Sequence, residues 1–291
     1  MAGLLSGLEQ FGLGGLESED IYEKKKEGQF SQDGQPAAQE KKDPLQLEME
    51  TLLEKSYTCP VCDNKFKQKS IRGNKTRLLE TDLDLRPRYE NVDTLKYDVV
   101  LCPKCGYAAL GRYFTYMTPA QAKLIREKIS TTFRFSEPDE PVYSYETALA
   151  RYKLALANAI VRKSKASERA YICLRAGWLM RGMAESLDSA EADYEKKKAE
   201  VQAAENEFLK NAFDGFITAR QTEAYPMCGM EKHTVDYLLA VLAIRFEEYD
   251  IASKLISGIL ISKNASQRMK DKAHDIKEIL LEKRKASKEA K

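Results

Sequence analysis

Two Cys-x-x-Cys motifs constrain the fold of this chain more than any other feature of its sequence. They read Cys59-Pro60-Val61-Cys62 and Cys102-Pro103-Lys104-Cys105. Each motif places two thiolates on one tight turn, and two such turns brought together by a β-hairpin complete a tetrahedral sulfur shell for zinc. Two disulfides fit badly with a cytosolic chain, and a redox motif does not ordinarily come with a second Cys-Pro-x-Cys. We therefore expect one structural zinc ion with a closed coordination sphere, held by Cys59, Cys62, Cys102 and Cys105.

The segment between the two motifs is long for a zinc ribbon. It covers residues 63–101, which is 39 residues, against about 15–20 in common four-cysteine sites. Alternating runs at 65–72, 77–85 and 95–101 predict three strands, with a turn at Gly73-Asn74. Gly106 relieves crowding after the second motif, and Asp63, which tolerates left-handed backbone, stands at the same place after the first. Residues 50–117 are expected to form a zinc-ribbon-like domain with an insertion.

Charged residues alternate along the first two expected strands. Lys65, Lys67 and Lys69 share one face, and Glu80, Asp82 and Asp84 share a face of the next strand. If the hairpin closes with Arg72 opposite Arg77, three lysine–carboxylate pairs form and neutralise one another: Lys69–Glu80, Lys67–Asp82 and Lys65–Asp84. This structural ladder is the preferred interpretation. Nucleic acid bound to the basic face and a divalent-metal site on Asp82 and Asp84 are the alternatives.

From Thr118 onward the hydrophobic period is helical. Thr118-Pro119 is a good helix start, and further helices are expected at 143–162, 166–186, 189–222, 233–247, 249–262 and 266–286. A small–large–small spacing, typical of tetratricopeptide repeats, recurs three times. It is found at Ala148-Tyr152-Ala155, Ala212-Phe216-Ala219 and Ala252-Ile256-Ile259. The expected fold is α+β, mostly α: the small β zinc ribbon, then a tetratricopeptide-like array over 118–286. A disordered or loosely docked tail at 1–49 and a charged tail at 287–291 flank these domains.

The expected groove of this array is apolar. Its lining, by the repeat register, is Ile172, Cys173, Ala176, Met180, Tyr237, Leu238, Val241 and Arg245. Only Arg245 can bind an anion there, so we expect the groove to take an apolar or helical protein segment. Such a groove must be covered, either by the chain's own Leu4-to-Leu16 segment, by the ribbon or by a partner.

Composition excludes several classes of protein. Lys and Arg number 47 against 45 Asp and Glu, which argues against a generally basic coat for nucleic acid. Apolar runs fall short of the about 20 residues of a membrane span, and the N-terminus does not resemble a secretory signal, so a reducing cytoplasm is expected. With two histidines and no phosphate-loop, HExxH or GxSxG motif, little catalytic chemistry is available. Cys173 is expected in the core, and Cys228 in an exposed connection.

Several motifs resemble one bacterial family of unknown function, DUF2225. They are CPVC, Arg77-x4-Asp82-x-Asp84, Pro87-x-Tyr89, Tyr97 and CPKCGYAALGRYF, together with the opening GLxxFGLGGL and the stretch AYICLRAGWLMRGM. The resemblance covers about residues 50–265. It implies a zinc-ribbon-like part with the four cysteines as ligands, followed by tetratricopeptide-like helices, and it supplies no established activity.

The function expected from the sequence is that of a cytoplasmic zinc-binding protein that acts in protein–protein interaction or scaffolding. A nucleic-acid-associated factor acting through the ribbon is the alternative. An enzyme is least supported, because no pair of groups has a spacing that demands catalysis. Its candidate residues are Arg77, Asp82, Asp84, Tyr89 and Tyr97.

Overall fold

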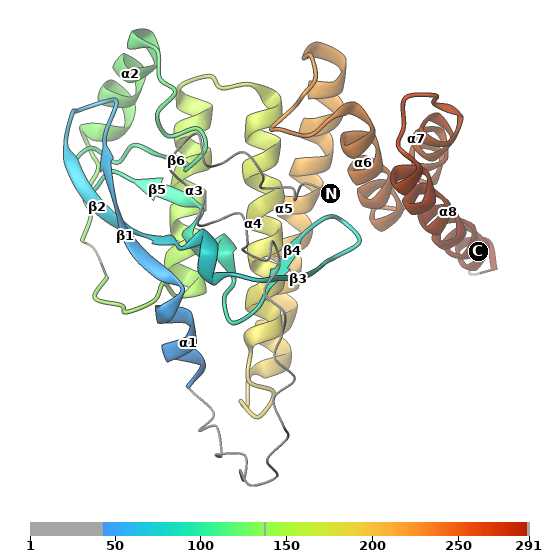
Figure 1. Cartoon of the computed structure of the whole chain (residues 1–291), viewed down its shortest axis with the longest axis horizontal. Coiled ribbons are helices and arrows are strands. Elements are labelled where there is room, and N and C mark those ends of the chain that lie inside the picture. Colours follow the sequence, from blue (N-terminus) through green and yellow to red (C-terminus); the bar gives the residue numbers. More distant parts are fainter. Residues whose placement is uncertain (1–42, 137, 290–291) are drawn as a thin grey trace, which may run out of the picture. The chain divides into compact units, whose positions relative to one another are not determined.

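The computed structural model describes residues 43–136 and 138–289 of the chain, all within one compact unit, Lys42–Lys291 (Figure 1). The Leu4-to-Leu16 segment and most of the expected tail lie outside the described residues. Residues 44–49, expected to belong to that tail, are part of helix α1 (Pro44–Glu50), whose start is capped by Asp43 and has proline at its first position. At the other end, the last helix continues through Glu289 into the expected charged tail.

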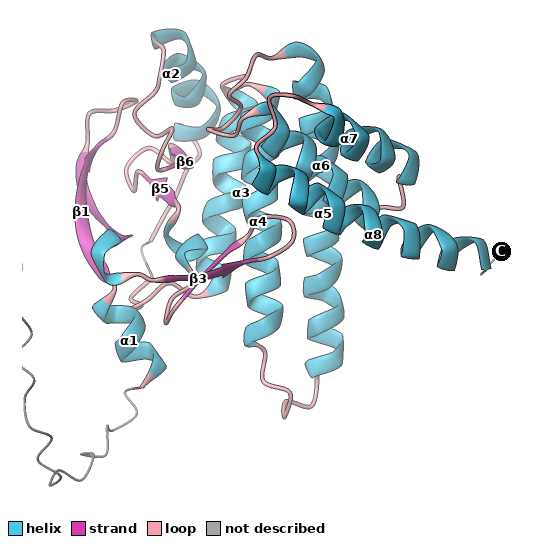
Figure 2. Cartoon of the chain, turned by 45° about the vertical axis from the view of Figure 1, so that its right-hand side comes forward, coloured by secondary structure: helices cyan, strands magenta, loops and turns pink. Residues whose placement is uncertain are grey.

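The fold class predicted from the sequence is confirmed: the structure is α+β and mostly α. The described residues contain three separate antiparallel hairpins (Figure 2). Their strands are β1 (Leu52–Thr58) with β2 (Lys65–Ile71), β3 (Leu78–Thr81) with β4 (Pro87–Tyr89), and β5 (Val99–Leu101) with β6 (Ala108–Leu110).

Each cysteine motif forms the turn of a hairpin. The first motif lies between β1 and β2, and the second lies between β5 and β6. The first turn is closed by the Cys59 amide, which donates to the Asn64 carbonyl at 2.9 Å. The second is closed in the same way, by the Cys102 amide donating to the Tyr107 carbonyl at 2.8 Å.

This arrangement overturns the predicted charge ladder. Strand β2 pairs with β1, which places Lys67 opposite Ser56, while β3 pairs with β4. The physical reason is that the first cysteine turn folds β2 back onto the strand before it, while β3 forms its own hairpin with the strand that follows it. The third expected strand is also shorter than predicted, because residues Thr94–Tyr97 form a 3-10 turn before β5 begins.

The helical region follows the predicted periods closely. Thr118 and Gln121 form a reciprocal capping box at the start of α2 (Pro119–Ile125), which continues as a π-helical turn, Arg126–Ser130. The expected helix at 189–222 begins later, at Tyr194. The remaining helices are α3 (Tyr145–Val161), α4 (Ala166–Ser186), α5 (Tyr194–Thr222), α6 (Lys232–Arg245), α7 (Tyr249–Ile261) and α8 (Gln267–Glu289).

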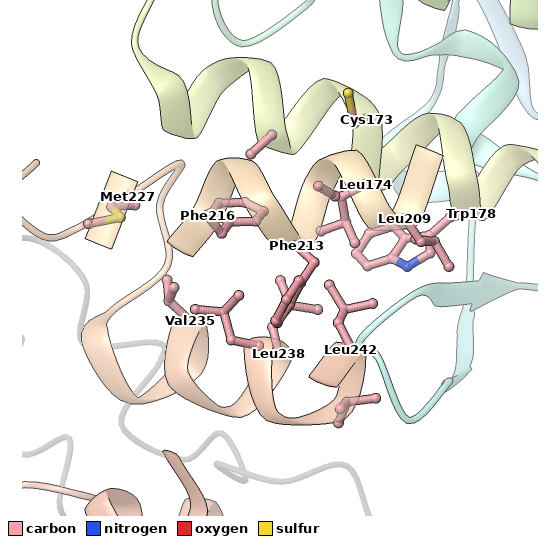
Figure 3. Close-up of a cluster of buried hydrophobic side chains, with 14 of the residues drawn as sticks. Cys173, Leu174, Trp178, Leu209, Phe213, Phe216, Met227, Val235, Leu238 and Leu242 are labelled. Atoms are coloured by element: carbon pink, nitrogen blue, oxygen red, sulfur yellow. The ribbon is translucent and has the colours of Figure 1, made fainter. Parts of the chain in front are cut away.

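Successive helices from α3 to α8 pack against one another, and α3, α4 and α5 lie side by side in both views (Figures 1 and 2). The nine residues of the small–large–small pattern are all buried. Figure 3 shows part of this core, where Phe213 and Phe216 of α5 lie between α4 and α6. The β5–β6 hairpin shares this core, since Val99 and Leu110 belong to the same cluster of buried side chains, together with Leu95 of the 3-10 turn before β5.

The apolar residues expected to line a groove are core residues. Ile172, Cys173, Ala176, Met180, Tyr237, Leu238 and Val241 are all buried. Helix α8 contributes to this burial, because it packs on α6 and its Lys272 lies over the Tyr237 ring. Among the described residues, no helix has the combination of length and apolar character that crossing a membrane requires.

Candidate metal centre

The two cysteine turns bring four thiols into one cluster. The sulfur atoms of Cys59, Cys62, Cys102 and Cys105 all lie within 4.8 Å of one another. Cys59 and Cys105 are separated by 3.5 Å, and Cys62 and Cys102 by 3.7 Å. A tetrahedral zinc site with Zn–S bonds of about 2.3 Å has sulfur atoms about 3.8 Å apart. The donor set and its spacing therefore fit a metal ion that prefers four thiolates.

Left-handed backbone follows both motifs, at the two positions that the sequence singled out. Asp63 has φ 55° and Gly106 has φ 75°. A Cβ atom on Gly106 would lie 2.5 Å from the Phe133 ring, so this position also lacks space for a side chain. The turns direct polar hydrogens at sulfur: the Val61 amide donates to Cys59 at 3.4 Å. Such hydrogen bonds stabilise thiolate charge.

Helices behind the cluster hold both turns in place. Arg126 Nη1 donates to the Val61 carbonyl at 2.7 Å, and Ser130 Oγ donates to the Cys105 carbonyl at 2.8 Å. From α3, the Asn158 amide donates to the Gly106 carbonyl at 3.0 Å. The cluster is thus a junction between two hairpins and two helical segments.

The pKa values of Cys59, Cys102 and Cys105 are shifted in opposite directions. Hydrogen bonds from Cys105 and Cys59 lower the pKa of Cys102 to about 2. The same contact with Cys102, together with burial, raises the pKa of Cys59 to about 12 and that of Cys105 further still. Without a cation, negative charge therefore gathers on one sulfur, whereas a bound divalent cation deprotonates its thiol ligands.

The two aspartates proposed as an alternative metal site lie in an arginine network. Arg181 of α4 contacts Asp84 with two nitrogens, at 3.0 and 2.6 Å, and Asp82 at 3.0 Å. Arg88 also pairs with Asp82. Guanidinium groups contact both carboxylates, and this arrangement does not favour a divalent-metal site on Asp82 and Asp84.

Further residues extend this network between the β3–β4 hairpin and the helices. Arg86 is bidentate to Glu185 at 3.1 Å, and Arg181 donates to Glu205 of α5 at 2.9 Å. Gly182 leaves room for these groups, because a Cβ there would lie 2.4 Å from the Asp93 carboxylate. The alternating charges of the strand could not indicate Arg181, Glu185 or Glu205 as partners, because these three residues lie on helices far along the chain.

The other candidate residues are dispersed. Arg245 pairs with Glu205 at 3.0 Å and donates to Asn206, so its charge is engaged within the fold. Arg77 is exposed just before β3, where its carbonyl accepts from the Glu90 amide. Tyr89 and Tyr97 line a cleft that Leu78 and Pro87 of the β3–β4 hairpin also border.

The two remaining cysteines lie outside the metal cluster. Cys173 is buried in the core, as expected, and burial raises its pKa to about 11. Cys228 is half-buried rather than exposed, and its thiol donates to the Ser167 carbonyl at 3.2 Å.

Comparisons with known proteins find relatives whose descriptions name no activity. A family model described as "Uncharacterized protein conserved in bacteria (DUF2225)" matches residues 52–280, which include all four cysteines. A protein of Borreliella burgdorferi described as "Uncharacterized protein" is 29% identical over 116 residues, covering 33% of this chain and 42% of that protein. The chain therefore matches less than half the length of this relative. No solved structure gives a significant match. Because the family model spans most of the sequence, the chain belongs to the DUF2225 family of bacterial proteins.

Proposed function

We propose that the protein is a binding module without catalytic activity, stabilised by one structural zinc ion. The observation that carries this proposal is the cluster of four sulfur atoms, three of them from buried cysteines, at the junction of two hairpins. Four thiolates complete the coordination of zinc, so no position is left for a substrate. Cysteines that must stay reduced for this role are typical of a cytoplasmic protein.

The proposed role of zinc is to hold the β1–β2 and β5–β6 hairpins together. Each hairpin is a two-stranded ribbon, and such ribbons are marginally stable alone. One ion bonded to both turns adds stability that the small apolar core of the two hairpins does not supply, as in other small metal-stabilised domains.

Hydrogen exchange of the full-length protein with and without a zinc chelator tests this role. Chelation is expected to increase exchange in β1, β2, β5 and β6, while α6 and α7 keep their protection. Cys173→Ser serves as the control variant and should respond to chelator like the wild type. Unchanged protection of the hairpins after zinc removal would contradict a structural role.

A protein partner remains our proposal for the binding function, through a different surface from the apolar groove. Three leucines of the β3–β4 hairpin and its turn are exposed, with Leu78 at 51%, Leu79 at 57% and Leu83 at 45% of their surface. Exposed apolar residues grouped on one element are a frequent mark of interaction sites. The arginine network below them keeps this hairpin in a fixed position on α4.

Site-specific photo-crosslinking in the native cell tests this surface. A photoreactive residue at Leu79 is expected to capture one defined protein, whereas the same residue at Ile261, which is 81% exposed on α7, should not. In a second experiment the photoreactive residue is placed at Leu78. It should capture the same protein in the wild-type background, and no longer do so when Leu79→Lys and Leu83→Lys are introduced together. Equal labelling from both positions would contradict a specific surface.

Nucleic acid remains the second candidate partner, because the corrected strand pairing leaves the basic face of β2 without the carboxylates expected to neutralise it. Lys65 and Lys67 are exposed, and the only ion pair of Lys67 within the described residues is a 3.7 Å contact to Glu54 between two exposed side chains. Binding to single-stranded RNA should weaken steeply with salt. Retention that is independent of salt, or unchanged in Lys65→Gln/Lys67→Gln, would reject this function.

A further inference from the structure

A cleft of about 660 Å³ lies between the three hairpins and helix α4. Its volume is within the range of about 300–1,000 Å³ that is common for small-molecule sites. The zinc cluster does not line it, and neither do Asp82 and Asp84. The cleft is therefore a second site, separate from the metal centre and from the arginine network.

Four tyrosines from different elements line this cleft. Tyr57 comes from β1, Tyr89 from β4, Tyr97 from the 3-10 turn and Tyr171 from α4. Tyr57 is fixed by stacking on Phe66, with the ring centres 5.8 Å apart. Tyr97 is buried, and its hydroxyl donates to Glu48 at 2.7 Å. Tyr97 also stacks on Tyr143, with the ring centres 5.3 Å apart, and the Tyr171 ring lies beside the guanidinium groups of Arg112 and Arg175. The half-buried Tyr89 is therefore the ring that offers a face on which a planar group can stack.

Positive charge is in excess in the lining. The lining contains three cationic side chains, Lys55, Arg112 and Arg175, and one carboxylate, Asp98. That carboxylate is neutralised within the fold, because Arg175 pairs with it and Tyr152 donates to it at 2.9 Å. Lys55 and Arg112 are exposed, so the cleft carries two cations that the fold does not neutralise with a cleft carboxylate.

Arg112 is held in a defined position before any ligand binds. Its Nη1 donates to the Cys228 carbonyl at 2.7 Å, and its guanidinium lies 5.4 Å from the Tyr113 ring centre and 5.6 Å from that of Tyr171. A Cβ on Gly229 would lie 2.6 Å from Arg112 Nη2, so the glycine makes room for this placement. A preorganised guanidinium is well suited to bind a phosphate.

We propose that this cleft binds a nucleoside phosphate. The planar base fits against the Tyr89 ring, the phosphate group matches the charge of Arg112 and Lys55, and Ser70, Thr76 and Thr94 offer hydroxyls for the sugar. The residues that line the cleft in the described part of the chain include no cysteine or histidine, and their one carboxylate is paired.

Calorimetry on the full-length, zinc-loaded protein tests this proposal with AMP, ATP, GTP, adenosine, inorganic phosphate and a ten-nucleotide RNA. At least one nucleotide is expected to bind ten-fold or more tightly than adenosine and inorganic phosphate, which each offer half of the recognised group. Arg112→Gln should weaken nucleotide binding about ten-fold or more, the expected loss of one charge-assisted contact.

Arg134→Gln is the matched control, because Arg134 is also exposed and donates to a backbone carbonyl at 2.7 Å, but lies outside the cleft. It should bind nucleotide like the wild type. Lys55→Gln, at an exposed strand position, is a second test that remains usable if Arg112→Gln misfolds. It should also weaken nucleotide binding. The proposal is overturned if no nucleotide binds, if Arg112→Gln and Arg134→Gln have equal effects, or if only the RNA binds.

Discussion

The indole Nε1 of Trp178 donates a 3.0 Å hydrogen bond to Oδ2 of Asp84, a residue 94 positions earlier in the chain. Trp178 belongs to the core of α4, whereas Asp84 lies in the turn of the β3–β4 hairpin. Arg181, one turn further along α4, binds the same carboxylate at 2.6 Å. These contacts explain how a short, partly exposed hairpin is fixed to the helices.

Replacing Arg181 with methionine should destabilise the protein strongly. Asp84 would remain buried without a cation, while Glu205 would keep only Arg245, and breaking a buried pair in this way costs about 3–5 kcal/mol. Arg284→Met is the matched control, because Arg284 pairs with Asp250 at the surface, where such pairs contribute about 0–1 kcal/mol. Urea unfolding measures both values. A cost below 1 kcal/mol for Arg181→Met would contradict the structural role of the network.

Two aspartates of this region should respond to acid in opposite ways. Burial raises the pKa of Asp82, but hydrogen bonds from Arg88 and Arg181 outweigh it, and the pKa is lowered. Burial dominates at Asp93 and raises its pKa. Asp82 therefore contributes stability above its unfolded pKa of about 3.9, which is lost as the pH falls through its folded pKa. The contribution of Asp93 is present below that unfolded pKa and is lost as the pH rises through its folded pKa.

The corresponding variants should change the slope of stability against pH in opposite directions. Between pH 6 and pH 3, Asp82→Asn should lose less stability than the wild type, and Asp93→Asn should lose more. Denaturant unfolding at several pH values measures these slopes. Parallel curves for the three proteins would show that neither aspartate is perturbed as described.

The two left-handed positions after the cysteine motifs should differ in their tolerance of substitution. Gly106→Ala introduces a Cβ into the Phe133 ring and puts a side chain at φ 75°, and we expect a loss of zinc affinity and stability. Asp63→Gly removes the side chain at φ 55°, where left-handed backbone costs an ordinary residue about 1–2 kcal/mol. It should be neutral or stabilising. Competition with a chromophoric zinc chelator compares the two, and equal effects would argue against the described turns.

The corrected strand pairing makes a charge-exchange experiment informative. Lys67→Glu should cost little, because Lys67 is exposed and lies opposite Ser56. Asp82→Lys should cost several-fold more, because it places a cation beside Arg88 and Arg181. Combining the two should rescue nothing. A double variant as stable as the wild type would instead support pairing of β2 with β3.

The sequence was a good guide wherever local chemistry decides the structure. Paired thiols at fixed spacing leave few arrangements, so the cysteine cluster and the left-handed turns were predictable. Helical periods gave the helix positions because each helix buries one face against its neighbours. The start of α5 was placed five residues early, since polar residues at 189–193 can continue a helix or form a turn equally well.

Long-range charge pairing was not predictable in the same way. Lysines alternate along β2 and carboxylates alternate along the segment that follows. This pattern is compatible with pairing of β2 with β3, and equally with the two separate hairpins that form. Asp82 pairs with Arg88 of its own hairpin, but the partner that Asp82 and Asp84 share, Arg181, lies about one hundred residues later, on α4, and is one of many arginines in the sequence. The cleft was missed for the same reason, because its tyrosines come from four separate elements and Arg112 comes from the segment after β6.

Native mass spectrometry of protein purified without chelator measures the metal directly and tests the central claim, that four cysteines hold one structural zinc ion. The wild type and Cys173→Ser should each carry about one zinc ion per chain. Cys59→Ser/Cys102→Ser, which removes one ligand from each turn, should carry none. Wild-type protein without zinc, or a double variant that keeps it, would contradict the claim.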